Sequence, residues 1–469
     1  MKMNNSIEIN KQWITDELQN SSDLTFKEVL YNGSTCMIVY FDTLVDATII
    51  NEHILRPMLD SSGGPLQSDI SIIGKEESDQ LDIIIHAIIT GNTVIQQDGS
   101  ANFLLLASEL HKDRTVDVTT NERVIRGSKQ AFVELFETNI NLIRTYIASP
   151  KLAITYYKMG ETTKSKVAVA YLKGACDQGI VDNLHQKIIE HSHEDIEVRL
   201  GFLKRVAQDD RFAFLPLMLV TERPDRVKAY LAEGKIALIV QDNADVIILP
   251  VSFWAFFQST DDYNMSWAFG SMIRLLRFTC FLLTLVLPAL YISVSTFIPY
   301  LIPTEIALTL QSSLQYIAMP PIIEILFMLL TLEIIREASI RLASPIGQTI
   351  GVVGGIILGT AVVQSNLVST MAIIIASFTG LASFVIPYYE MNLSVRLITY
   401  PIIFSAQLFG LVGIVCCMML FIIHLSRMKT LGSPYYQATF PFIDSMRDTL
   451  YRPPNRNLVK RSRKQPSTK

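Results

Sequence analysis

The sequence predicts an α/β soluble N-terminal region of two subdomains, followed by an α-helical membrane domain with several spans. Three observations lead to this prediction. The chain has 469 residues, too many for one ordinary soluble domain. Its overall composition, 49% hydrophobic and 18% charged, hides a split along the chain. The first part reads as soluble protein, residues 278–425 are dominated by long apolar runs, and residues 426–469 are polar and basic.

The first predicted subdomain, residues 1–149, alternates strand-like and helix-like runs. "CMIVYF" at 36–41 and the apolar, β-branched "DIIIHAII" at 82–89 are predicted strands. "TVIQQD" and "NFLLLAS" follow, with the turn signals "GNT" and "DGS" around them. Residues 128–147 space their apolar side chains three or four apart, which predicts an amphipathic helix.

The pattern restarts after Ser149–Pro150, so residues 150–258 are predicted to form a second α/β subdomain. "KVAVAYLKG" at 166–174 is a predicted buried strand, and residues 183–206 read as a polar helix. Residues 223–251 predict a helix that stops at Gly234, then two strands joined around Asp242.

Two motifs of the soluble region resemble chemical sites. "GETTKSK" at 160–166 lacks the second glycine directly before the lysine of a phosphate-binding loop, which favours a charged loop before a strand. "HSHED" at 191–195 is more typical of the solvated face of a polar helix than of a metal site. No catalytic set is defined by order and spacing, so we predict no enzyme activity, no cofactor and no metal.

The chain start lacks the basic and apolar pattern of a secretory signal, which predicts a cytoplasmic soluble region. The five cysteines show no metal or redox spacing, as expected in a reducing compartment.

Four segments of the membrane domain are clear predicted spans, each near the ~20 residues that cross a hydrocarbon core. The first starts inside, because Arg274 and Arg277 precede it in the predicted linker 259–277. The four spans are residues 278–298, 346–364, 367–389 and 400–425.

The second predicted span carries a regular glycine pattern. Glycine recurs every fourth residue, so on a helix the glycines form one stripe without side chains. Such stripes let helix backbones approach closely in lipid. We predict a helix-packing face at Gly347, Gly351, Gly355 and Gly359.

Residues 320–342, a predicted polar membrane helix, carry five charges in an apolar setting. Glu333, Arg336, Glu337 and Arg341 fall on one arc with the spacing of intrahelical ion pairs, and Glu324 lies opposite. A charge facing lipid at mid-bilayer costs about 2.5–3.5 kcal/mol or more. Two interpretations stay open: an interfacial amphipathic helix, or a helix that lines a water-filled path or a subunit interface.

The tail, residues 426–469, has ten lysines and arginines against two aspartates, a net charge of +8. This predicts a cytoplasmic tail near anionic lipid, or a disordered tail, and the two are compatible. With both ends inside, the number of crossings is even. A full crossing by residues 320–342 would make five, so either that helix or another span is expected not to cross completely.

Ordered sequence blocks make nearly the whole chain similar to a known family. The blocks include "RGSKQAFVELFETNINLIRTYI" at 126–147, "TERPDRVKAYLAEGKIALIV" at 221–240, "EIIREASIRLASPIGQTIGVVGGIILG" at 333–359 and "HLSRMKTLGSPY" at 424–435. The chain resembles the A subunit of the GerA-type nutrient germinant receptors of spore-forming Firmicutes, a family that includes a stage V sporulation paralogue.

The resemblance implies a multi-pass protein of the spore inner membrane, with its soluble region and tail in the cytoplasm. It implies a transporter-like B subunit that binds the nutrient, and a lipoprotein C subunit. It also implies that A subunits form a homo-oligomer, a pentamer, and act as a ligand-gated channel that releases monovalent cations to start germination. Neither a cofactor nor a nucleic-acid partner follows from it.

The alternative function is a non-conducting membrane scaffold that assembles the B and C subunits. If the chain forms a channel, the charged arc of residues 320–342 is expected to face the pore vestibule or a subunit interface. The candidate pore or interface residues are Glu324, Glu333, Arg336, Glu337 and Arg341.

Overall fold

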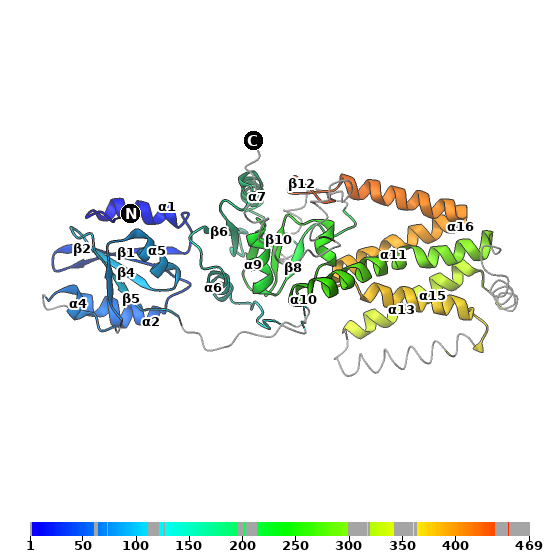
Figure 1. Ribbon diagram of the computed structural model, residues 1–469, viewed down its shortest axis with the longest axis horizontal. Coiled ribbons are helices and arrows are strands. Elements are labelled where there is room, and N and C mark those ends of the chain that lie inside the picture. Colours follow the sequence, from blue (N-terminus) through cyan, green and yellow to red (C-terminus); the bar gives the residue numbers. More distant parts are fainter. Residues whose placement is uncertain are drawn as a thin grey trace. The chain divides into compact units, whose positions relative to one another are not determined.

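The computed structural model describes residues 2–60, 64–72, 74–110, 122, 124, 127–194, 201, 213–298, 317, 319–341, 360, 364–436 and 449. The chain divides into two compact units, here named the α/β unit and the helical unit (Figure 1). The α/β unit comprises Met1–Arg211, Met218–Val251 and Thr430–Ser433. The helical unit comprises Phe212–Leu217, Ser252–Lys429 and Pro434–Lys469.

The first sheet of the α/β unit is antiparallel, with the strand order β1-β2-β4-β5-β3. Its strands are β1 (Leu24–Tyr31), β2 (Ser34–Phe41), β3 (Glu76–Ser78), β4 (Thr93–Gln97) and β5 (Phe103–Leu106). Its helices are α1 (Ile7–Glu17), α2 (Ala47–Ile49), η1 (Ile50–Leu55), α3 (Arg56–Leu59), α4 (Leu66–Asp69) and α5 (Leu81–Ile89).

Helices cover both faces of this sheet, and β2 shows why the sequence allows it. Successive side chains of a strand point to opposite faces. Met37 and Val39 pack in one core with α1 and α5, whereas Ile38 and Tyr40 pack in another core with η1 and α3. The predicted strand "CMIVYF" is therefore confirmed, and its unbroken apolar run reflects burial on both sides.

The predicted strand at residues 82–89 is wrong, because this segment forms α5. Ile84, Ile85 and Ile88 are buried while Asp82 and His86 are exposed, which is the burial pattern of a helix. Short apolar runs do not distinguish a strand from a buried helix, and the β-branched composition favoured the wrong choice here.

The second sheet is also antiparallel, with the order β6-β7-β9-β10-β8. The predicted strand at 166–174 and the predicted pair of strands around Asp242 are confirmed. The strands are β6 (Leu152–Met159), β7 (Ser165–Leu172), β8 (Leu219–Thr221), β9 (Ile236–Val240) and β10 (Val246–Leu249). The helices are α6 (Phe136–Tyr146), α7 (Gln178–Glu190) and α9 (Pro224–Ala232).

The two sheets repeat one topology, which the sequence did not reveal. Numbered along the chain, the five strands of each sheet occur in the same spatial order. A buried asparagine of the first helix marks the repeat: Asn10 in α1 accepts from the backbone N–H of Asn4, and Asn139 in α6 accepts from that of Val133, both at 2.9 Å. Each asparagine also donates to the carbonyl of the same residue.

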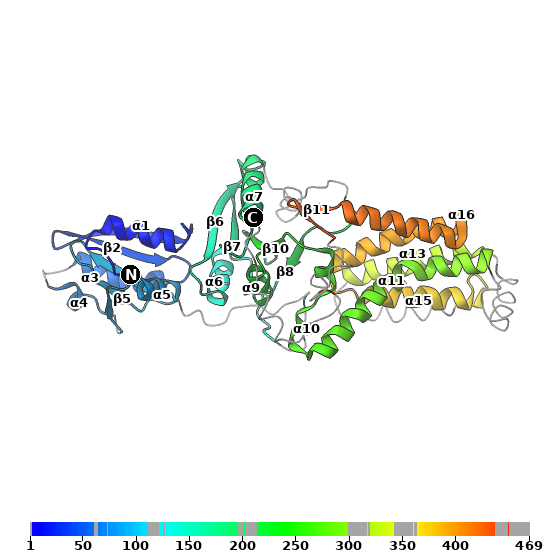
Figure 2. The same cartoon turned by 45° about the horizontal axis from the view of Figure 1, so that its top comes forward.

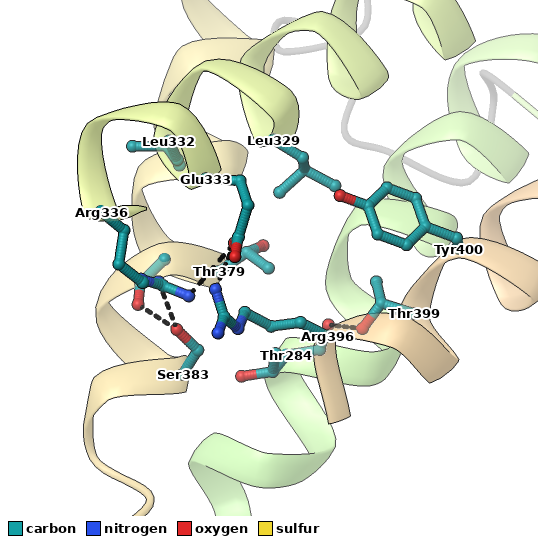
Figure 3. A pocket seen from close by; sticks show the side chains of 11 residues that line it. Thr284, Leu329, Leu332, Glu333, Arg336, Thr379, Ser383, Arg396, Thr399 and Tyr400 are labelled. Atoms are coloured by element: carbon teal, nitrogen blue, oxygen red, sulfur yellow. Dashed lines mark hydrogen bonds and ion pairs between the residues drawn. The ribbon is translucent and has the colours of Figure 1, made fainter. Parts of the chain in front are cut away.

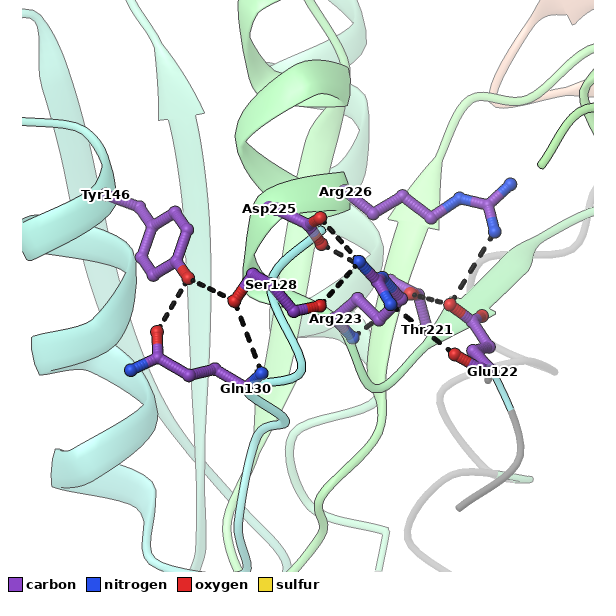
Figure 4. A network of polar contacts seen from close by, with 8 residues as sticks. All are labelled: Glu122, Ser128, Gln130, Tyr146, Thr221, Arg223, Asp225 and Arg226. Atoms are coloured by element: carbon purple, nitrogen blue, oxygen red, sulfur yellow. Dashed lines mark hydrogen bonds and ion pairs between the residues drawn. The ribbon is translucent and has the colours of Figure 1, made fainter. Parts of the chain in front are cut away.

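The helix predicted at residues 128–147 is shorter than expected, because α6 begins only at Phe136. Figure 4 shows what holds the preceding segment. The buried Arg223 guanidinium donates to the Ser128 carbonyl oxygen at 3.0 Å and pairs with Asp225. The Tyr146 hydroxyl donates to the Gln130 side chain at 2.7 Å. These contacts between distant parts of the chain compete with local helix formation.

One buried ion pair joins the two halves of the α/β unit. The Arg144 guanidinium on α6 donates to both carboxylate oxygens of Asp23, each at 2.8 Å, and to the Ser21 hydroxyl at 2.6 Å. The Arg144 side chain is 1% exposed and the Asp23 side chain is fully buried. The Arg144 guanidinium also stacks on the Phe41 ring, 4.1 Å from its centroid.

The helical unit starts earlier than predicted. Residues 259–277, expected as a linker, form α10 and the first turns of α11. The predicted span 346–364 lies almost entirely outside the described residues. The described elements are η2 (Phe253–Phe257), α10 (Thr260–Asn264), α11 (Trp267–Phe297), α13 (Pro321–Arg341), α15 (Thr370–Phe384), α16 (Tyr389–Arg427), β11 (Lys429–Thr430) and β12 (Ser433–Pro434).

Contacts among these helices fix their directions. Near one point of α11, Tyr291 bonds Ser369 at the start of α15, and Ser369 bonds Glu324 at the start of α13. Nearer the start of α11, Thr284 shares a cavity with Arg336 and Ser383, close to the ends of α13 and α15. Both α13 and α15 therefore run antiparallel to α11.

The long helix α16 is two antiparallel arms rather than one rod (Figures 1 and 2). Gly410, with φ 59° and ψ −139°, turns the chain between them in a conformation almost restricted to glycine. The arms touch tightly, because a Cβ on Gly413 would lie 2.1 Å from the Ser405 carbonyl oxygen. The turn packs against Phe297 at the end of α11, and Phe421 of the second arm lies beside Phe281.

Candidate functional site

A small charged cavity lies among the four main helices of the helical unit (Figure 3). The cavity has a volume of about 30 Å³, which is enough for one or two water molecules. Hydroxyl groups and three charged side chains face it. The lining residues are Thr284, Leu329, Leu332, Glu333, Arg336, Thr379, Gly380, Ser383, Arg396, Thr399 and Tyr400.

The Glu333 side chain faces this cavity and contacts two arginines. Arg336, one helical turn away on α13, places Nη1 at 3.4 Å from the Glu333 carboxylate. Arg396 reaches the same oxygen from the first arm of α16. Both guanidinium groups are largely buried, 11% and 13% exposed. We name these three residues the Glu333 cluster; it holds two positive charges against one negative charge.

The surroundings hold the two arginines in place. Arg336 donates to the Ser383 hydroxyl at 3.1 Å and stacks on the Phe384 ring, 4.4 Å from its centroid. Arg396 donates to the Asn392 carbonyl oxygen at 3.4 Å. The Glu333 cluster thus ties α13 to α15 and α16 by charge-assisted contacts.

The four charges predicted to share one arc separate into two environments. The predicted intrahelical pairs Glu333–Arg336 and Glu337–Arg341 are both confirmed. However, the Glu337 and Arg341 side chains are 52% and 78% exposed, outside the cavity. Two of the four therefore belong to the Glu333 cluster, and two form an exposed pair at the end of α13.

Sequence reasoning missed Arg396, the third member of the cluster. It carries the one formal charge between Glu390 and His424. An isolated charge among apolar residues of a membrane segment is itself a signal of function. The prediction overlooked it because the last span was placed at 400–425, whereas α16 begins at Tyr389.

Glu324, predicted on the opposite side of α13, is completely buried. Its Oε2 accepts hydrogen bonds from the Ser369 backbone N–H at 3.0 Å and from the Ser369 hydroxyl at 2.8 Å. Ser369 is the N-cap of α15. Glu324 therefore joins α13 to α15 and does not take part in the Glu333 cluster. The predicted packing glycines Gly347, Gly351, Gly355 and Gly359 lie outside the described residues.

A second buried charge group stands at the start of α11. Asp262 of α10 accepts from Arg274 at 3.1 Å and from Arg277 at 2.7 Å. Arg277 also donates to the Phe257 carbonyl oxygen at 3.0 Å. The two arginines that were predicted to mark the inner end of the first span are thus buried partners of one aspartate.

Among the described residues of the α/β unit, the sequence motifs and the cysteines do not form a metal site or a reactive thiol. The described residues contain no group of three or more histidine, cysteine or acidic side chains placed to hold a metal. "GETTKSK" covers the turn between β6 and β7 and the first two residues of β7, and its Lys166 pairs with Glu137 at the surface. Burial raises the pKa of the Cys36 and Cys176 thiols to about 11, so both stay protonated at neutral pH.

Comparison with known proteins decides the family. The family description "Bacillus/Clostridium GerA spore germination protein" matches residues 12–464. The chain belongs to the GerA family. Spore germination protein A1 of Bacillus subtilis (strain 168) is 34% identical over 457 residues, covering 95% of this chain and 94% of that protein.

Other GerA relatives match over similar lengths. Spore germination protein GerQA of Bacillus cereus is 35% identical over 429 residues, covering 91% of this chain and 85% of its own length. The uncharacterized membrane protein YfkQ of Bacillus subtilis (strain 168) is 32% identical over 452 residues, covering 94% and 88%.

A crystal structure of the N-terminal domain of the A subunit of the Bacillus megaterium spore germinant receptor GerK3 matches with a TM-score of 0.43 and 23% identity. The match covers 54% of this chain and 98% of that one. Among the described residues of this GerA protein, α11 and α16 are long and apolar enough to cross a membrane.

Proposed function

We propose that the chain is the A subunit of a spore nutrient germinant receptor and that several copies form a gated channel for monovalent cations. The Glu333 cluster carries this proposal. Isolated charges are expensive within a membrane and persist mainly where they face a water path or a neighbouring protein. Here one acid and two arginines sit beside a cavity lined by hydroxyl groups, among apolar helices.

The size of the cavity favours a conduit between copies rather than within one chain. A space for one or two waters is too small for a nutrient and too short for a pore. An A-subunit homo-oligomer, a pentamer, would supply the missing wall. The nutrient site then belongs to a transporter-like B subunit, and a lipoprotein C subunit completes the receptor in the spore inner membrane.

Ion flux through the purified chain tests this function. The full-length protein, reconstituted alone into potassium-loaded vesicles, is expected to release potassium, and the release should depend on the Glu333 cluster. Glu333→Gln should change the rate, while Glu337→Gln, on the exposed pair, serves as the matched control. A folded, vesicle-inserted protein without potassium release, also in the presence of the B and C subunits, would support the non-conducting scaffold instead.

The helix directions support a six-crossing topology for this channel. A single helix of 39 residues would be about 58 Å long, nearly twice the hydrocarbon thickness, whereas two arms meeting at Gly410 fit it. α13 and α15 both run antiparallel to α11, so they are parallel to each other. The chain must therefore cross once more between the end of α13 and the start of α15, and the predicted span 346–364 would provide this crossing. Six crossings place both chain ends in the cytoplasm without excluding residues 320–342.

Cysteine labelling tests the two arms of α16. In a variant without the five native cysteines, a cysteine at Leu408 or Val412, next to the turn, should react with a membrane-impermeant maleimide added on the side opposite the α/β unit. A cysteine at Arg427 should react only from the side of the α/β unit. If the Leu408 and Arg427 positions react from the same side, the hairpin is re-entrant and the six-crossing topology is wrong.

A further inference from the structure

Glu324 differs from Asp262 and Glu333 of the helical unit in having no arginine beside it among the described residues. Asp262 contacts two arginines, and so does Glu333. Glu324 is fully buried, and its hydrogen bonds come from the neutral Ser369. Its second oxygen, Oε1, has no hydrogen-bond partner among the described residues.

The three arginines of residues 278–426 all pair with carboxylates other than Glu324. Residues 278–426 contain three arginines, one histidine and no lysine. Arg336 and Arg396 contact Glu333, and Arg341 pairs with Glu337. The stretches of this domain outside the described residues contain neither lysine nor arginine. Among the described residues, no basic side chain therefore forms an ion pair with Glu324.

The hydrogen bonds around Ser369 leave acceptor capacity at two oxygens. The single Ser369 hydroxyl proton goes to Glu324 Oε2, while the Ser369 oxygen accepts from the Ala372 N–H at 3.1 Å. Tyr291, whose hydroxyl lies 3.1 Å from the Ser369 oxygen, must then be the donor of that bond. Its own oxygen keeps lone pairs, as does Glu324 Oε1.

We propose that Glu324 binds a monovalent cation from solution, with Oε1 as the charged ligand and the Tyr291 hydroxyl oxygen as a neutral one. The two Ser369 donors and the N-terminus of α15 act on Oε2, which leaves Oε1 as the carboxylate oxygen that can face a ligand. A buried carboxylate without a counter-charge is costly, and a bound cation removes that cost.

The oxygen chemistry of this site favours a single positive charge. Ca²⁺ takes six to eight oxygen ligands, commonly from several carboxylates, and Mg²⁺ requires near-ideal octahedral geometry. Glu324 supplies one carboxylate, and no group of three or more histidine, cysteine or acidic side chains among the described residues is placed to hold a metal ion. The role of this site, to hold a permeating ion, rests on the proposed channel function. Cation binding by Glu324 does not itself require conduction.

Equilibrium binding of radioactive rubidium to the full-length protein in detergent at neutral pH tests this site. Glu324→Gln keeps an oxygen to accept from Ser369 and removes the charge, so the rubidium affinity should fall about tenfold or more. Glu337→Gln, which removes a charge from the exposed end of the same helix, should bind rubidium as the unaltered protein does. Thermal unfolding without rubidium checks that both variants are folded.

Two results would overturn the cation site. The first is that Glu324→Gln binds rubidium with unchanged affinity. The second is that the infrared spectrum of the unaltered protein contains a protonated carboxyl band that is missing from the spectrum of Glu324→Gln. Such a band would show that a proton neutralises Glu324. Failure of the channel is a separate result. A chain that binds rubidium through Glu324 but releases no potassium from vesicles would retain this site and disprove the conducting function.

Discussion

Replacing Arg144 with alanine is expected to lower the unfolding free energy of the α/β unit by about 3–5 kcal/mol. The substitution leaves the Asp23 carboxylate buried without its bidentate partner and removes the donor to Ser21. It also removes the guanidinium stacked on Phe41. Chemical or thermal unfolding of the full chain, followed by a signal from the α/β unit, measures the loss.

A surface ion pair provides the control for Arg144. Lys166 and Glu137 pair at 2.9 Å with side chains 48% and 59% exposed. Exposed pairs contribute about 0–1 kcal/mol, so Lys166→Ala should change stability little. Asp23→Ala should match Arg144→Ala, since each leaves one uncompensated charge. Equal, small effects for Arg144→Ala and Lys166→Ala would contradict the joining role of the buried pair.

Replacing Glu333 with glutamine is expected to reduce nutrient-triggered potassium release from spores by about tenfold or more. The change leaves Arg336 and Arg396 largely buried without a counter-charge, so their mutual repulsion should displace α13 from α16. Potassium in the medium after addition of nutrient measures the release, and immunoblotting of spore membranes confirms an equal amount of protein.

Two further variants make the Glu333 result specific. Combining Glu333→Gln with Arg396→Gln returns the cluster to its original net charge and should recover part of the release. Glu337→Gln removes a charge four residues away, at an exposed pair, and should leave release near the unaltered level. If Glu337→Gln reduced release as strongly as Glu333→Gln, general charge on α13 rather than the Glu333 cluster would be responsible.

The sequence predicted the α/β unit well where local pattern and burial agree. The strands at 36–41 and 166–174 are flanked by turn residues and carry β-branched side chains. It failed at 82–89, where both a strand and a helix can bury such a run, and at 128–135, where Arg223 and Tyr146 hold the chain from a distance. The repeated sheet topology was hidden because strand order depends on long-range pairing.

The candidate site was only partly predicted, because some of its contacts join residues that are far apart in the sequence. Pairs within one helix, Glu333–Arg336 and Glu337–Arg341, follow from spacing alone. The contact between Glu333 and Arg396 spans 63 residues and requires the packing of two helices. Likewise, an apolar run does not reveal that Gly410 folds it in two, because hydropathy is insensitive to a single backbone turn.

The division of the chain into units has a consequence for the assembly of the second sheet. The α/β unit contains Val251, before the helical unit, and also Thr430–Ser433, after it. Leu431 belongs to the core of the second sheet, beside Leu238 and Ile247. In sequence, the segment Ser252–Lys429 is thus an insertion into the α/β unit. The core of the second sheet is completed only by residues that follow this insertion, so that core cannot be finished until the chain on both sides of the insertion is present.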